Sequence, residues 1–99
     1  MKDYIESLNR AFESRIRLGI MSALMVNDDV DFASMKELLD VTDGNLASHV
    51  SALEKYNYIL VNKKFVGKKP NTRYQITEEG RAAFMKHLNA LEVLIKKTN

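Results

Sequence analysis

Basic side chains are concentrated in one stretch of this 99-residue chain. Residues 42–73 hold six Lys and Arg against two carboxylates, a net charge of +4, whereas residues 1–41 have a net charge of −3. The basic members of the stretch are Lys55, Lys63, Lys64, Lys68, Lys69 and Arg73. Ammonium and guanidinium groups gathered in this way can neutralise the phosphates of a nucleic acid. Most charge runs are merely solvated, so the elements that carry these side chains must decide between the two interpretations.

The first part of the stretch, residues 42–57, is predicted to be a helix. Thr42 is a suitable N-cap, and Asn57 tolerates the left-handed conformation that often follows a helix end. An apolar stripe of Leu46, Val50 and Leu53 indicates the face that packs in the core. The opposite face has short side chains and no carboxylate, which lets it approach DNA closely. It carries Gly44, Ser48, Ser51, Ala52 and Lys55, with Asn45 on one flank.

His49 lies on the same flank as Asn45 but nearer to the apolar stripe. A packed or capping histidine and a histidine that contacts a base both fit this position. Ser48 and Asn45 are the preferred base-edge readers, whereas Ser51 and Lys55 are expected to meet the DNA backbone.

The second part of the stretch, residues 58–77, is predicted to be a β-hairpin. Tyr58 to Val66 is rich in strand-forming residues, and Thr72 to Thr77 returns as the second strand. Residues 67–71 form the loop, because Gly, Pro and Asn are turn formers. The hairpin would bring Lys63, Lys64, Lys68, Lys69 and Asn71 to the duplex backbone beside a helix that fits the major groove.

Upstream, residues 4–26 are expected to be helical, either as one helix or as two with a break near Glu13 and Ser14. Gly19 within this segment costs about 1 kcal/mol in helix propensity relative to Ala, and it could permit a close helix crossing. Residues 30–32 alternate like a very short strand that could pair with the base of the hairpin.

A short helix is expected to begin at Ser34, because Ser34 and Glu37 match a capping box. It ends by Asp40, only a few residues before the Thr42 cap. Two helices joined so closely form a helix-turn-helix pattern, in which the second helix reads the DNA.

The ordered set of these segments resembles the winged-helix transcriptional regulators of the MarR/ArsR type, and most of all their short single-domain members. The similarity lies in RIRLGIMSAL, VDFASMKELL, TDGNLASHVSALEKYNYI and KKFVGKKPNTRYQITEEGRAAF, nearly the whole chain. It implies a mainly α fold with a small β-hairpin, a winged helix-turn-helix with N- and C-terminal dimerisation helices. It also implies a sequence-specific DNA-binding transcriptional regulator.

The resemblance further implies that Arg73 contacts a phosphate or the minor groove, although an ion pair with Asp or Glu remains the alternative. Two features depart from the family pattern. Asn57 stands where the family often has Gly, and the chain lacks the Cys pair with which some relatives bind metal.

The last helix, residues 78–97, is predicted to begin at a Thr77 cap and to form a homodimer interface. Its apolar surface is too broad for a small core, and the N-terminal segment adds a second apolar stripe. The expected interface residues are Ile5, Leu8, Phe12, Phe84, Leu88, Leu91 and Ile95. The alternative is that this helix packs wholly on its own domain. His87 is expected to be a surface or interface residue.

Residues 1–99 are thus interpreted as a single winged-helix domain that binds double-stranded DNA in the cytoplasm. No phosphate-binding loop or catalytic motif is present, and two His without Cys do not suggest a metal site, so we expect no enzyme activity, cofactor or metal. No run of about 18 apolar residues suggests a membrane span. No segment is left over for an effector pocket within one chain, so a ligand would lie between subunits. The alternative function is a winged helix that binds a protein.

Overall fold

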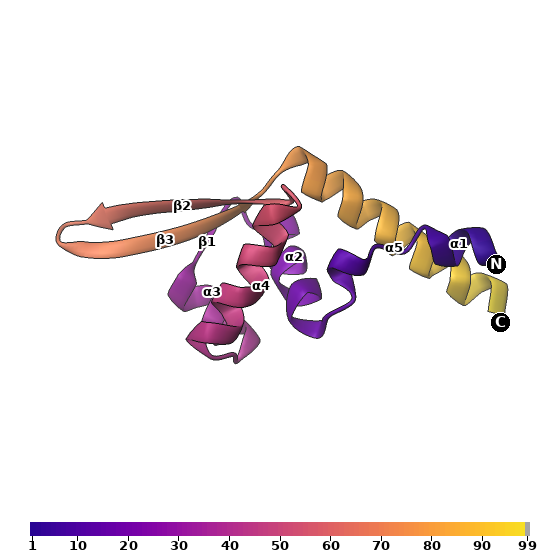
Figure 1. Ribbon diagram of the computed structural model, residues 1–99, viewed down its shortest axis with the longest axis horizontal. Coiled ribbons are helices and arrows are strands. Elements are labelled where there is room, and N and C mark those ends of the chain that lie inside the picture. The colour runs from indigo at the N-terminus through magenta and orange to yellow at the C-terminus, as the bar shows by residue number, and fades with distance from the viewer. Residues whose placement is uncertain (99) are drawn as a thin grey trace.

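The computed structural model describes residues 1–98 as an elongated molecule with extents of 54 × 25 × 21 Å (Figure 1). The elements follow in the order α1 (Lys2–Glu6), η1 (Arg10–Phe12), α2 (Arg15–Val26), β1 (Val30–Asp31), α3 (Phe32–Leu39), α4 (Asp43–Lys55), β2 (Ile59–Val66), β3 (Lys69–Ile76) and α5 (Glu78–Thr98). The mainly α fold class with a small hairpin is confirmed. None of the helices in the described part of the chain is long and apolar enough to cross a membrane.

The N-terminal segment forms two helices and a single turn between them, so the interpretation of residues 4–26 as one helix is wrong and the two-helix alternative is confirmed. Side chains that bind the backbone cause the interruption. Asn9 Oδ1 accepts a hydrogen bond from the Ala11 N–H (2.9 Å), and Ser14 Oγ accepts one from the Arg17 N–H (3.2 Å). Ser14 is therefore the N-cap of α2.

Helices α2, α3 and α4 enclose the core together with the base of the sheet. The predicted stripe of Leu46, Val50 and Leu53 is buried. Gly19 lies where α2 and α3 cross, and a Cβ there would be 2.5 Å from Leu39 Cδ2. The close crossing expected at Gly19 is confirmed.

Helix α3 begins three residues earlier than its capping box predicts, because its N-cap is Asp31 and not Ser34. Asp31 is the N-cap, and its carboxylate accepts a hydrogen bond from the Ser34 N–H (2.7 Å). The prediction that Ser34 caps this helix is wrong because β1 holds Asp31 extended directly before Phe32. Both residue types are good caps, and the sheet pairing decides between them.

The three strands form an antiparallel sheet in the order β1-β3-β2. Val30 pairs with Tyr74, which confirms that the short first strand joins the base of the hairpin. The hairpin turn is shorter than predicted, because Pro70 and Asn71 belong to β3. Gly67, with a φ of +66°, permits the tight turn between β2 and β3.

The start of α5 is fastened to the end of α4. Asn57 has a φ of +62°, as expected for the residue after this helix end. The Thr77 hydroxyl donates to the Asn57 carbonyl (2.7 Å) and accepts from the Gly80 N–H (2.8 Å), which confirms the Thr77 cap. A Cβ on Gly80 would lie 2.1 Å from the Tyr58 carbonyl oxygen, so only glycine fits this crossing.

Two of the predicted interface residues belong to the core instead. Phe12 is 0% exposed and Phe84 is 2% exposed. Their rings meet edge to face at 5.1 Å between centroids, and Phe12 also packs on Tyr58 at 5.3 Å. The prediction that Phe12 and Phe84 lie in the dimer interface is wrong, because the first half of α5 covers its own domain.

His87 is also buried, at 4% exposed, so the expectation of a surface or interface residue is wrong. Its Nδ1 accepts a hydrogen bond from the Asn9 N–H (2.9 Å), and its ring packs edge-on against Phe12. Burial lowers the pKa of His87, an effect that Glu13 partly opposes. The neutral ring therefore links α5 to the N-terminal segment.

Candidate nucleic-acid interface

Helix α4 presents the predicted polar face to solvent. The exposed residues of that face are Gly44, Asn45, Ser48, Ser51 and Lys55. The Thr42 hydroxyl accepts a hydrogen bond from the Asn45 N–H (3.2 Å) and so caps the helix. The carboxylate of Asp43 pairs with Lys36 Nζ at 2.7 Å, which offsets its negative charge at this end of the face. The surface is therefore small and polar, and the exposed carboxylate of Glu54 lies at its edge toward the hairpin.

The side chain of His49 is half-buried beside this face and is engaged by α2. Arg17 Nε donates a hydrogen bond to His49 Nδ1 (3.1 Å). Burial, together with the nearby Arg17 charge, lowers the pKa of His49. A neutral ring that accepts at Nδ1 carries its proton at Nε2, so this second nitrogen is a hydrogen-bond donor. The packed interpretation of His49 is therefore supported, while a DNA contact through Nε2 stays a prediction.

Arg73 forms ion pairs at the base of the hairpin. Its Nε donates to Asp29 Oδ1 (2.9 Å), its Nη2 contacts the same oxygen, and its Nη1 lies 3.7 Å from Asp31 Oδ2. Bonding to Asp29 and the two carboxylate charges raise the pKa of Arg73. Asp29 and Asp31 thus fasten β1 to β3 through this guanidinium, as the ion-pair interpretation of Arg73 expects.

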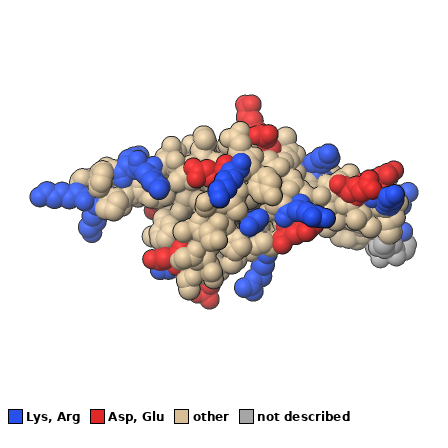
Figure 2. Space-filling view, in the orientation of Figure 1, with Lys and Arg blue, Asp and Glu red and all other residues tan. Residues whose placement is uncertain are grey.

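The lysines of the hairpin lie farther out and remain exposed. Lys63 and Lys64 are on β2, Lys68 is in the turn and Lys69 begins β3. Figure 2 shows blue side chains extending from the end of the hairpin. Asn71 is half-buried, and its Oδ1 is buried without a hydrogen-bond partner among the described residues. The lysines, more than Asn71, are placed to contact a backbone.

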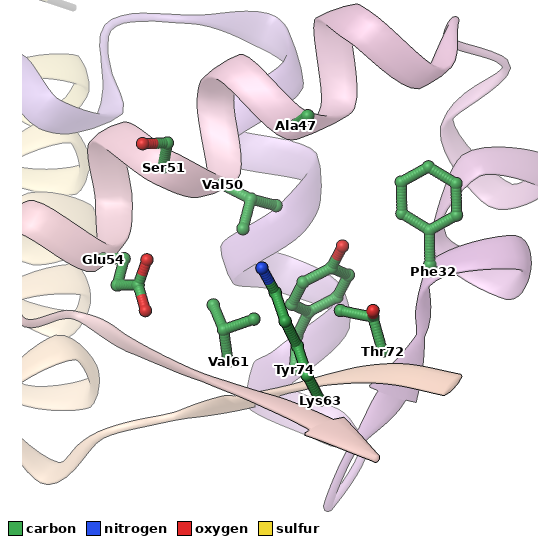
Figure 3. A pocket seen from close by; sticks show the side chains of 9 residues that line it. All are labelled: Phe32, Ala47, Val50, Ser51, Glu54, Val61, Lys63, Thr72 and Tyr74. Atoms are coloured by element: carbon green, nitrogen blue, oxygen red, sulfur yellow. The ribbon is translucent and has the colours of Figure 1, made fainter. Parts of the chain in front are cut away.

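An open groove of about 600 Å³ separates α4 from the hairpin (Figure 3). Its lining residues are Phe32, Ala47, Val50, Ser51, Glu54, Val61, Lys63, Thr72 and Tyr74. The groove is open to solvent, and the prediction that an effector would lie between subunits stays a prediction. The Lys63 ammonium enters the groove from the hairpin, and the Glu54 carboxylate enters it from the α4 wall, where Ser51 also lies (Figure 3).

The terminal arm, defined as α1 with residues 85–97 of α5, projects from the core at the end opposite the hairpin (Figure 1). Ile5, Met85, Leu88 and Ile95 are exposed, and Leu8 and Leu91 are half-buried. A groove of about 420 Å³ between the two helices is lined by residues such as Tyr4, Met85 and Val93. Five of the seven predicted interface residues therefore lie partly or fully at the surface.

A capped helix with a small polar face, a preceding short helix and an adjacent basic hairpin define a winged helix-turn-helix. This arrangement can insert α4 into a major groove while the hairpin, the wing, meets the backbone. Among residues 1–98, no group of His, Asp and Glu side chains is placed to hold a metal ion.

Comparison with known proteins agrees with this class. The family described as "Winged helix DNA-binding domain" matches residues 16–95. An uncharacterized protein of Methanocaldococcus jannaschii is 31% identical over 87 residues, which cover 88% of this chain and 95% of its own length. The structure of a transcriptional regulator homologue from Pyrococcus horikoshii matches with a TM-score of 0.89 and 28% identity, over 100% of this chain and 99% of that chain.

A MarR-family transcriptional regulator from Enterococcus faecalis shares the fold, with a TM-score of 0.66, 20% identity and coverage of 98% of this chain and 80% of that chain. The chain belongs to the winged helix DNA-binding domain family. The resemblance to winged-helix transcriptional regulators is confirmed, and family and fold together indicate a DNA-binding regulator.

Two features of the site are absent from the sequence interpretation. One is the pairing of Arg73 with Asp29, which lies 44 positions earlier and has no local signal. The other is the exposure of Phe65 at the end of β2. The lysines around Phe65 could have indicated its exposure, because a ring flanked by four lysines has few apolar neighbours against which it can pack.

Proposed function

We propose that this regulator binds duplex DNA as a homodimer, with α4 in the major groove and the wing on the neighbouring backbone or minor groove. The observation that carries the proposal is the juxtaposition of the polar α4 face with four exposed wing lysines. Neither surface packs against the rest of the chain, and Ser51 of the α4 face and Lys63 of the wing both line the groove between them. A phosphate at the mouth of this groove would meet the Lys63 ammonium on the hairpin wall and, on the α4 wall, the Ser51 hydroxyl next to the Glu54 carboxylate, so Lys63 has to supply the attraction.

The homodimer part of the proposal rests on the terminal arm. Exposed Ile5, Leu88 and Ile95 form an apolar surface of the kind that usually marks an interface. A two-fold dimer would place two copies of α4 about 34 Å apart, one duplex turn, so that one protein could read a symmetric site. The wing then lies at the far end of each protomer from the arm, which leaves it free to reach DNA (Figure 1).

Binding to a random duplex library tests the DNA-binding part directly. The recovered sequences should contain two related half-sites, and the logarithm of the affinity should fall linearly with the logarithm of the salt concentration. Ser48→Ala and Asn45→Ala should each relax the preference at one position of each half-site, by about 1–3 kcal/mol per lost base contact. Affinity without salt dependence or base preference would favour the alternative, a winged helix that binds a protein.

A further inference from the structure

The outer end of the wing exposes large apolar side chains. Phe65 is 72% exposed and Val66 is 63% exposed, although both lie in a regular strand. Pro70, directly opposite Phe65, is exposed as well. These side chains add little to the core, and an apolar patch at the end of a projecting hairpin indicates a contact outside the chain.

The strand register tells which side of the wing Phe65 occupies. Val61 pairs with Tyr74, Lys63 with Thr72 and Phe65 with Pro70. Alternate residues of a strand point to the same face, so these three pairs share one face. The first two pairs line the groove below α4, as Figure 3 shows. Phe65 and Pro70 therefore continue the face that looks toward α4, whereas Val66 points to the other side.

The charge around the apolar pair selects the kind of partner. Between Asn62 and Arg73 the sequence contains Lys63, Lys64, Lys68 and Lys69 and no carboxylate. All four lysines are exposed. Four positive charges around one aromatic ring repel a basic surface and attract a polyanion, so charge complementarity points to a phosphate-lined groove.

We propose that Phe65, backed by Pro70, is an apolar wedge that enters the minor groove of the bound duplex and partly unstacks one base step. This inference rests on the DNA binding proposed above. Apolar side chains inserted from the minor groove kink the duplex, and the flanking lysines would hold the phosphates that border the groove. Pyrimidine–purine steps unstack most easily, so the wedge adds a preference for a flexible step beside the bases that α4 reads.

The test compares the unmodified protein with Phe65→Ala and with the matched control Val66→Ala on the opposite face. The probe is a duplex recovered from the random library by the unmodified protein, labelled at both ends for energy transfer. A second copy carries 2-aminopurine at the flexible step. The unmodified protein and Val66→Ala should shorten the end-to-end distance and raise the 2-aminopurine fluorescence. Phe65→Ala should bind with an unchanged salt slope but return both signals nearly to those of free DNA.

A bend and a fluorescence change that persist in Phe65→Ala would overturn the wedge while leaving the proposed DNA binding intact. Failure of the unmodified protein to bind any duplex with salt-dependent affinity would instead remove both proposals. Vesicles containing phosphatidylserine provide the third arm, since a basic and aromatic tip can also bind a membrane surface. If Phe65→Ala loses vesicle binding but leaves the DNA signals unchanged, the wedge is wrong. The melting temperature of each variant verifies that the fold is retained.

Discussion

The wing and the terminal arm leave the core at opposite ends of the molecule, and both expose apolar side chains (Figure 1). They differ in the charge around those side chains. The outer wing carries four lysines and no carboxylate, whereas residues 85–97 carry Lys86, Lys96 and Lys97 together with Glu92. Lys96 Nζ and Glu92 Oε1 even form an ion pair at 2.8 Å. Apolar exposure alone therefore does not identify a partner, and the surrounding charge distinguishes the surface proposed to bind DNA from the surface proposed to bind a second chain.

The largest expected effect comes from breaking the arm. Leu88→Glu with Leu91→Glu would bury charges without partners in the proposed dimer interface, where desolvation is costly. Sedimentation should then show a monomer, and the affinity for a symmetric duplex should fall on the order of 10²- to 10⁴-fold because two linked half-site contacts become one.

The matched control for this change is Lys86→Glu with Lys97→Glu. At 100° per residue these positions lie on the side of α5 opposite Leu88, so two charge reversals there should leave the protein dimeric. A dimer that survives Leu88→Glu with Leu91→Glu in a folded protein would exclude the arm as the interface. The protein would then follow the alternative in which α5 packs only on its own domain.

The next largest effect is a loss of stability expected at Gly80, where α5 meets the backbone just before the wing. Gly80→Ala would place a methyl group against the Tyr58 carbonyl, at the point where α5 crosses the start of the wing. We expect a loss of roughly 3 kcal/mol or more in unfolding free energy, because backbone on both sides must move. Gly44→Ala is the control, since a Cβ at Gly44 meets nothing within 4 Å. It should be neutral or stabilising by up to about 1 kcal/mol in denaturant titrations, and a similar loss in both variants would contradict the junction.

A smaller change in stability is expected when the pH is lowered, because His87 is buried. The pKa of His87 in the folded chain is lowered from its ordinary 6.5, so below pH 6.5 the unfolded chain binds the proton more readily. Neutral His87 therefore contributes fully to the unfolding free energy above pH 6.5, and this contribution is lost as the pH falls toward the folded-state pKa of His87. His49 acts in the same direction. The melting temperature should decrease on acidification, and less so in His87→Gln; an identical pH profile in the variant would assign the effect elsewhere.

The sequence predicts helix ends and helix faces correctly where residues close together in the chain determine them. Thr42, Asn57 and Thr77 act at their helix ends through contacts within a few residues or through their own backbone preference. The polar face of α4 follows from helical periodicity, and its exposure matches the prediction. The sequence was ambiguous at α3, where Asp31 and Ser34 are both suitable caps, and the pairing of Asp31 with Arg73 on β3 selects Asp31.

Contacts between distant segments account for the remaining errors. Phe12 and Phe84 belong to two separate apolar stripes, and only the packing of η1 against α5 decides that their rings face each other instead of a second chain. Likewise, His87 becomes buried because Asn9 reaches it across the fold. Arg73 is basic in the sequence, but its two Asp neighbours are brought to it by β1. The net charge counted along residues 42–73 therefore overstates how many basic side chains are free to contact DNA.

The salt dependence of duplex binding tests most directly the central claim that the wing meets DNA and the arm does not. Two variants remove the same charge from the two regions: Lys68→Ala with Lys69→Ala in the wing, and Lys86→Ala with Lys97→Ala in the arm. The wing variant should bind all sequences more weakly and reduce the slope of log affinity against log salt by roughly one to two for each bound protomer, while the arm variant should keep the slope of the unmodified protein. Equal slopes in the wing variant and the unmodified protein would contradict this account.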